Sequence, residues 1–134
     1  MYKSLPNSNK VLNLKVVGET TGLEYEGKFV VKRALSIKDK QSIELTKTRI
    51  TEDTANPSNS LFAIASMVAL LRARLVEYPE WWKELGFGSE LLDENVLIEL
   101  FDKSENLALE WRQSLQPKEE ELGNGKGEKK DPSP

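Results

Sequence analysis

The segment from Leu61 to Val76 constrains the fold most, because it has a helical pattern and is apolar on almost every side. Apolar residues recur three or four positions apart and predict a helix over about residues 60–78. Leu61, Ile64, Ala65, Val68, Leu71 and Leu75 form one face of it. Such a helix is buried centrally or against another polypeptide. We therefore expect more apolar helical surface than one small layer of structure can cover.

A corner follows this helix at Pro79-Glu80-Trp81-Trp82. Proline disfavours the α conformation of the residue before it, so the helix should end at the corner. The aromatic residues Trp81, Trp82 and Phe87 either lock the corner or contact a partner, since tryptophan is common both in well-buried sites and in binding hot spots. A third arrangement places one indole inward and the other outward.

Three other helical segments are expected. Ser36 can cap a helix that runs to about Arg49, and the thin apolar stripe of this helix predicts a surface position. Asn59 or Ser60 is expected to cap the apolar helix, and residues 80–85 to form one short turn. Asp93 is expected to cap the last helix, over about residues 94–115, which carries a clean apolar stripe.

The N-terminal part shows the alternation of apolar and polar residues that is typical of β-strands. Apolar and polar residues alternate over 11–17 and again over about 23–34, with a turn at 18–22. Gly27 interrupts the second stretch and predicts a bulge or a tight turn. These segments predict a two- or three-stranded antiparallel unit, which must pack on the helices because an isolated hairpin is marginally stable.

The expected fold is therefore α+β and mainly α-helical, with a small N-terminal antiparallel β-hairpin packed on about three helices. We expect a flexible N-terminus over residues 1–10 and a single globular domain over 11–115. Residues 116–134 are rich in glycine, proline and charge and predict a disordered tail.

Composition excludes several classes of function. The 134 residues include no cysteine and no histidine, which removes disulfides, thiolate metal sites and the commonest general base. We expect no enzyme activity, no metal and no cofactor, and we interpret Asp93-Glu94 as a helix cap. The net charge of −3 favours a solvated surface at Lys32, Arg33 and Lys38 over a nucleic-acid site. No segment predicts a signal peptide or a membrane span, so we expect a cytoplasmic protein.

Several of these segments together resemble the small tail assembly chaperones of long-tailed bacteriophages. The resemblance covers about residues 11–115 and rests on the order of the segments and on the kinds of residue in them. Its segments are Thr21–Arg33, the helix start Ser36-Ile37-Lys38-Asp39, the apolar helix Asn59–Glu77, Pro79-Glu80-Trp81-Trp82, and Asp93–Leu97 leading to Glu110-Trp111. Members of that family are not enzymes. The resemblance implies a protein that coats the tape measure protein, keeps it soluble and helps to recruit tail tube subunits.

The expected partner surface combines the apolar helix and the corner after it. An exposed apolar groove, repeated by self-association, would cover the apolar stripes of a tape measure protein. The candidate contact residues are Phe62, Met67, Leu70, Ala73, Trp81, Trp82 and Phe87. Met67 and Leu70 suit a surface that accepts varied sequence, because flexible side chains can repack.

Two alternative functions remain open from the sequence. One is a structural virion component, such as a head-to-tail connector or a tail terminator subunit. The other is a cytoplasmic regulatory or hydrolytic domain that uses Asp39, Asp93 or Glu94. The resemblance also implies a longer frameshifted product, with which the glycines and lysines of residues 125–130 are compatible.

Overall fold

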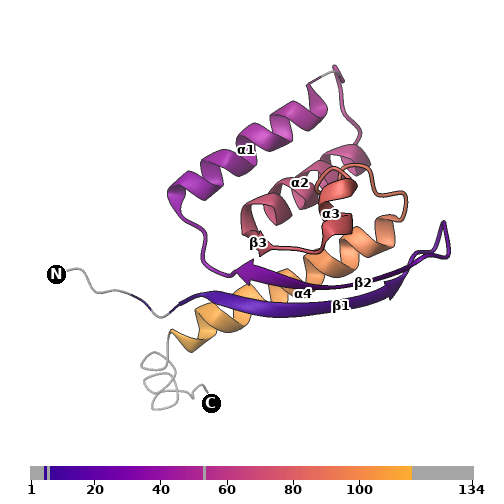
Figure 1. Cartoon of the computed structure of the whole chain (residues 1–134). Helices are drawn as coiled ribbons and strands as arrows, with labels where there is room; N and C mark the ends of the chain where they lie inside the picture. Colours follow the sequence, from indigo (N-terminus) through magenta and orange to yellow (C-terminus); the bar gives the residue numbers. More distant parts are fainter. Residues whose placement is uncertain (1–4, 6, 53, 116–134) are drawn as a thin grey trace, which may run out of the picture.

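The computed structural model of the chain describes residues 5, 7–52 and 54–115 (Figure 1). The elements run in the order β1 (Asn9–Val17), β2 (Glu24–Lys32), α1 (Ile37–Thr51), α2 (Asn59–Arg74), β3 (Leu75–Glu77), α3 (Glu80–Glu84) and α4 (Glu94–Ser114). The strands form one antiparallel sheet in the order β1-β2-β3, which confirms the α+β class. The predicted tail at 116–134 lies outside the described residues. So do residues 1–4 and 6 of the predicted lead-in, and β1 begins within that segment, at Asn9.

The sheet is built on the predicted alternation. β1 pairs with β2 without a break, from Asn9 opposite Lys32 to Val17 opposite Glu24. Leu12 and Leu14 are buried on the same face as Phe29 and Val31, while their sequence neighbours point outward. This apolar face contacts α4 through β1 and α2 through β2. The sheet and these two helices therefore enclose one hydrophobic core.

The prediction was wrong about the end of the apolar helix. α2 stops at Arg74 and not at Tyr78, because Leu75 has extended backbone angles, φ −80° and ψ 114°. Leu75–Glu77 forms β3, which pairs with β2 at Val30 and Val31. A helix could not continue through Pro79, and the short strand instead gives part of the edge of β2 a hydrogen-bonding partner.

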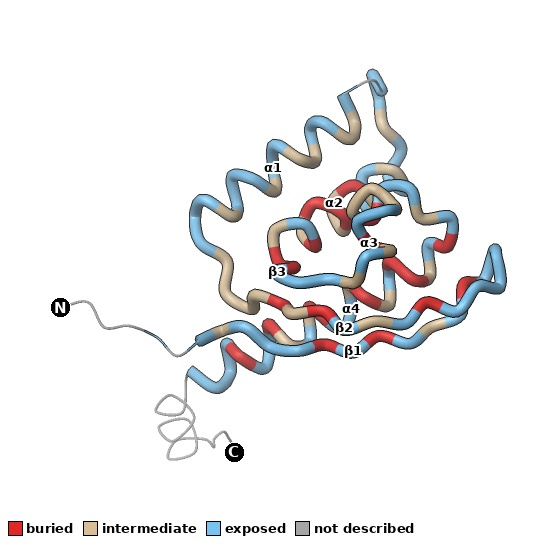
Figure 2. Tube along the Cα trace, viewed as in Figure 1, coloured by how far each residue is buried: buried red, intermediate tan, exposed pale blue. Residues whose placement is uncertain are grey.

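Helix α1 lies beside α2, away from the sheet (Figure 1). It contains no buried residue, as Figure 2 shows, so its predicted surface position is confirmed. The start of α2 differs from the prediction, because Ser58 is the N-cap residue and accepts a hydrogen bond from the backbone N–H of Leu61. Asn59 and Ser60 lie within the first turn of the helix.

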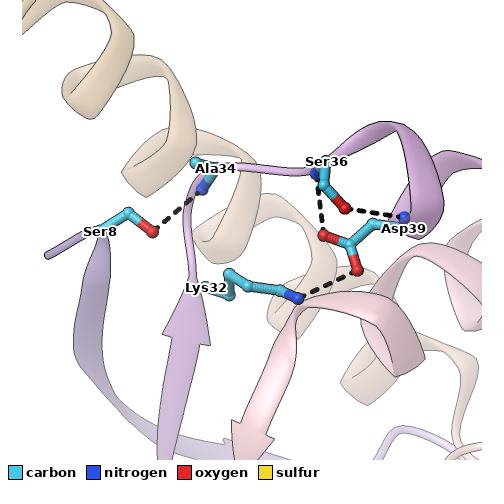
Figure 3. A network of polar contacts seen from close by, with 5 residues as sticks. All are labelled: Ser8, Lys32, Ala34, Ser36 and Asp39. Carbon is cyan, nitrogen blue, oxygen red and sulfur yellow. Dashed lines mark hydrogen bonds and ion pairs between the residues drawn. The ribbon is translucent and has the colours of Figure 1, made fainter. Parts of the chain in front are cut away.

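A polar network fixes the link between β2 and α1 (Figure 3). Ser36 accepts from the N–H of Asp39, and the Asp39 carboxylate accepts from the N–H of Ser36, which completes a capping box. Lys32 Nζ lies 3.0 Å from Asp39 Oδ1, so the last residue of β2 also binds the first turn of α1. The N–H of Ala34 donates more weakly, over 3.4 Å, to Ser8 Oγ. The direction in which α1 leaves the sheet is thus set by local hydrogen bonds.

Gly27 was predicted as a bulge or a turn, and this was wrong. It pairs with Leu14 inside the regular ladder. A Cβ atom at this position would lie 2.6 Å from Pro79 Cγ and 3.4 Å from Trp81 Nε1. The glycine therefore allows the corner before α3 to approach the backbone of β2.

Replacing Gly27 with alanine should destabilise the protein by about 1–3 kcal/mol, because the added methyl group overpacks this contact. Urea unfolding of the wild type and Gly27→Ala measures the loss. Pro79→Ala removes the nearest opposing atom, so Gly27→Ala should cost less in that background. Equal losses in both backgrounds would contradict the steric explanation.

Candidate partner-binding groove

An open groove of about 560 Å³ lies where the β1–β2 turn faces α3 and the loop that leads to α4. Apolar and aromatic side chains form its floor, and carboxylates stand around them. The lining residues are Thr21, Leu23, Glu24, Tyr25, Glu26, Trp81, Glu84, Leu85, Glu90 and Leu92. Its size is within the range of natural ligand sites, and its openness to one side suits a segment of polypeptide.

The floor is held by an aromatic cluster. The rings of Tyr25 and Trp81 meet edge to face at 5.3 Å, and Phe29 lies 5.9 Å from Trp81. Trp81 Nε1 donates to the backbone oxygen of Glu26 over 2.9 Å. This bond fixes the indole of a half-buried side chain against β2. The aromatic floor is therefore rigid before any partner arrives.

The two tryptophans lie in different environments, which agrees with the prediction of one indole inward and the other outward. Trp81 lines the groove, whereas Trp82 is 1% exposed and lies in the core. A Cβ at Gly88 would lie 2.6 Å from the Trp82 ring, so the loop after α3 passes directly over the indole. Direct partner contact by Trp82 is contradicted, because no partner can reach a side chain so fully covered.

Two leucines stand out at the rim of the groove. Leu23 is 60% exposed and Leu92 is 71% exposed, and both lie in loops and not in helices or strands. Four glutamates surround them, at positions 24, 26, 84 and 90. Glu24 forms a solvent-exposed 3.7 Å ion pair with Lys15, a weak interaction that leaves it available to other cations. The rim therefore combines accessible apolar surface with negative charge.

The groove wall depends on Asp93. Its carboxylate accepts hydrogen bonds from the N–H groups of Thr20 and Thr21, over 2.7 and 2.9 Å. It also accepts from Thr21 Oγ1 and from the Tyr25 hydroxyl, each over 2.7 Å. A side chain at Gly18 would collide with this carboxylate. Asp93 is at the N-cap position of α4, as predicted, but its side chain makes no cap hydrogen bond and instead binds the β1–β2 turn.

Hydrogen bonding determines the ionisation of Asp93 and Tyr25. Burial favours the neutral acid of Asp93, but the donors from Thr21, Tyr25 and Thr20 outweigh burial and lower the pKa of the carboxyl from 3.8 to about 2. The same contact raises the pKa of Tyr25, because its hydroxyl donates to the carboxylate. Asp93 is therefore ionised in the folded protein at neutral pH. With four donors on a fully buried carboxylate, it holds the turn in place and is not free to act on a substrate.

Asn95, two residues after Asp93 in the first turn of α4, supports the same β1–β2 turn. Its Nδ2 donates to the backbone oxygen of Val17 over 2.9 Å, and its Oδ1 accepts from the N–H of Glu19 over 3.0 Å. The last residue of β1 and the first residues of the turn are thus bound to α4 on both sides of Gly18. These contacts place Leu23 opposite the loop that carries Leu92.

The structure places the other predicted contact residues outside the groove. Phe62 is 49% exposed on α2, with Lys47 Nζ of α1 lying 5.3 Å from its ring centre. Met67, Leu70 and Ala73 are half-buried. Phe87, also half-buried, stacks edge to face on Tyr78 at 5.5 Å, and its backbone has a positive φ of 54°. Contact with a partner through Phe62, Met67, Leu70, Ala73 or Phe87 stays a prediction.

Sequence reasoning missed most of the groove. Leu23, Leu85 and Leu92 were not among the candidates, which came from the outward face of the apolar helix and from the aromatic residues of the corner after it. Leu23 opens the second predicted strand, Leu85 ends the predicted turn and Leu92 lies between predicted helices, and none of these positions by itself indicates a binding surface. The convergence of these loops depends on Asp93, which links positions about 70 residues apart.

Comparisons with protein-family models, curated proteins and solved structures gave no match to this chain. Within residues 5, 7–52 and 54–115, no three acidic side chains converge to form a metal site. No helix in the described part of the chain has both the length and the apolar character to cross a bilayer. The groove and the packing around it are therefore the basis for the functional argument.

Asp93→Asn should lower the temperature of the unfolding midpoint at pH 7. It should also reduce the fall of this midpoint as the pH is lowered. The folded-state pKa lies below the unfolded value, so the stabilisation is complete above pH 3.8 and is lost as the pH falls towards about 2. Thermal unfolding followed from pH 7 to pH 2 measures both effects.

Glu94→Gln is the matched control, because Glu94 is the exposed neighbour of Asp93 in the first turn of α4. Hydrogen bonds from Ser36 and Lys32 outweigh burial and also lower the pKa of Asp39, so Asp93→Asn should remove only part of the acid dependence. An acid profile for Asp93→Asn that matched the wild type would contradict the assigned role.

Proposed function

We propose that this chain is a partner-binding protein of the tail assembly chaperone type, and that its groove holds an apolar segment of a tape measure protein. The single observation that carries the proposal is the pair of exposed leucines, Leu23 and Leu92, above a fixed aromatic floor. Burial of the two rim leucines and part of the Trp81 indole would supply the apolar contact of an interface. The resemblance to tail assembly chaperones supports the choice of partner.

The charges at the rim indicate what the bound segment should contain. Four glutamates border the groove, and none of the residues that line it is basic. A segment with one or two large apolar side chains flanked by lysine or arginine would match both features. Charge at a rim mainly affects orientation and association rate, whereas the leucines and the aromatic floor determine how long the complex lasts.

The aromatic floor also favours binding without rearrangement. Tyr25 is held by Asp93, and Trp81 by the backbone of Glu26. Side chains already fixed in the free protein lose little conformational freedom on binding. A chaperone that covers many similar apolar stripes along one long protein benefits from such a preformed site.

Within this proposal the protein acts in the cytoplasm of the host cell, covers the tape measure protein before the tail is polymerised and brings tail tube subunits to it. Phe62, exposed on α2, offers a second contact for repeated copies on one partner. Such a chaperone should be absent from mature particles, whereas a connector or a tail terminator subunit would remain in them. Mass spectrometry of purified particles distinguishes these functions.

Charge introduced at the groove should abolish partner binding. The double variant Leu23→Asp and Leu92→Asp should fold, since both side chains are exposed. We expect each substitution to weaken the complex by about 2 kcal/mol or more, as at interface hot spots. The measurement is co-purification and solubility of the tape measure protein encoded in the same genome, after co-expression with each variant.

The matched control is Ile37→Asp with Leu45→Asp on α1, at positions 80% and 60% exposed and outside the groove. The control should bind like the wild type. Binding lost only in the α1 variant, or retained in the groove variant, would contradict the proposed site. A genome without a tape measure gene would contradict the proposed partner.

A further inference from the structure

A second cavity, of about 240 Å³, lies at the other end of the sheet and is basic. It is lined by Arg33, Ala34, Leu35, Lys40, Arg74, Trp111 and Arg112. The four cations come from four parts of the chain: the link after β2, the first turn of α1, the end of α2 and the end of α4. They converge although the whole chain carries a net charge of −3.

Nearby carboxylates neutralise only part of this charge. Glu105 Oε2 lies 2.8 Å from Arg74 Nη1 and pairs with that one guanidinium. Asp39, close to Lys40 in sequence, is already bound by Lys32 and by the N–H of Ser36. Counting Glu105 against Arg74, and with no other ion pair to these cations among the described residues, the cavity retains the charges of Arg33, Lys40 and Arg112.

Arg74 is the unusual member, because it is only 4% exposed. Its Nη1 binds Glu105 and weakly contacts Ser104 Oγ at 3.5 Å, but its Nε has no hydrogen-bond partner among the described residues. Burial, and less strongly the nearby charge of Arg112, lower the pKa of Arg74, while Glu105 opposes them. The positive charge of this buried guanidinium, next to the cavity, would favour an anion there, although Nε itself is covered.

Other contacts hold the cavity walls in position. Arg33 Nε donates to the backbone oxygen of Ser8 over 2.8 Å, at the strand end whose neighbouring network is drawn in Figure 3. The capping box at Ser36 fixes the first turn of α1, from which Lys40 projects. Trp111 is almost fully buried and supplies one apolar wall. The cations are therefore carried by anchored elements, as a preformed binding site requires.

We propose that this cavity binds the phosphate group of a small organic phosphate. Guanidinium groups match phosphate oxygens in geometry and charge, and three uncompensated cations suit a dianion better than a single carboxylate. The cavity is larger than the phosphate group needs, and Trp111 offers an apolar surface for a short organic part. This inference is independent of the proposed partner, which occupies the other end of the molecule.

The test uses the full chain and two probes, inorganic phosphate and glycerol 3-phosphate, with chloride at matched ionic strength as the reference. Isothermal titration calorimetry should give one saturable site for glycerol 3-phosphate, and thermal unfolding should move to higher temperature with the same probe. Weaker binding of inorganic phosphate would indicate that the organic part contributes. The same affinity for acetate as for phosphate would overturn the assigned ligand class.

Lys40→Gln with Arg112→Gln removes two exposed cavity cations and should weaken binding at least about tenfold, because their charge-assisted hydrogen bonds to the phosphate are lost. The control Lys38→Gln with Lys103→Gln removes the same charge from α1 and α4 outside the cavity and should bind like the wild type. Circular dichroism checks that both variants fold. Equal weakening in both, or no saturable binding by the wild type, would overturn the proposal.

Discussion

The buried carboxylate of Asp93 is the interaction on which the groove depends. It joins the start of α4 to a turn about 70 residues earlier, through two backbone N–H groups and two hydroxyls. No cation among the described residues forms an ion pair with it, so its stability rests on the geometry of its donors. A turn of another length or shape could not present the three donors of Thr20 and Thr21 beside the Tyr25 hydroxyl of β2. The position of Leu23, and with it one wall of the groove, follows from this requirement.

Aromatic packing in the core is a second constraint, and it fixes the position of α3 and Trp81. Trp82 fills the space between the sheet and the loop after α3, with Phe29 6.0 Å away and Gly88 directly over its ring. Trp81, its neighbour in sequence, packs edge to face against it at 6.3 Å and completes the groove floor. α3 has only five residues and would not be stable alone. Trp82 therefore anchors α3, and α3 in turn positions Trp81 in the groove.

What could be predicted from the sequence was the part of the fold that depends on local pattern. The alternation around Leu12 and Phe29 gave both long strands, and the stripe from Val96 to Trp111 gave α4. β3 could not be predicted, because Leu75 continues the helical period and is turned into a strand by Pro79 and by the edge of β2. The roles of Gly27 and Asp93 were missed for the same reason, since the contacting atoms are far away in sequence.

The candidate site was predicted only at Trp81. Apolar periodicity identifies residues that are buried within a helix face, and such residues are the ones a fold covers with its own elements. Met67 and Leu70 are accordingly half-buried, and Met67 packs against the core. The accessible apolar side chains of the groove are instead in loops, where no periodicity exists. A surface formed by loops from distant parts of the chain leaves no periodic pattern in the sequence.

The net charge of −3 conceals a separation of charge along the molecule. β2 begins at Glu24 in the acidic groove and is followed by Arg33 in the basic cavity, and α4 runs in the same way from the loop of Glu90 to Arg112. A strand of nine residues and a helix of 21 residues each span roughly 30 Å, which is several Debye lengths at physiological salt. The two ends therefore act on charged molecules almost independently. The proposed basic apolar segment at one end and the proposed small anion at the other would not compete, because the groove and the cavity share the scaffold but no lining residue.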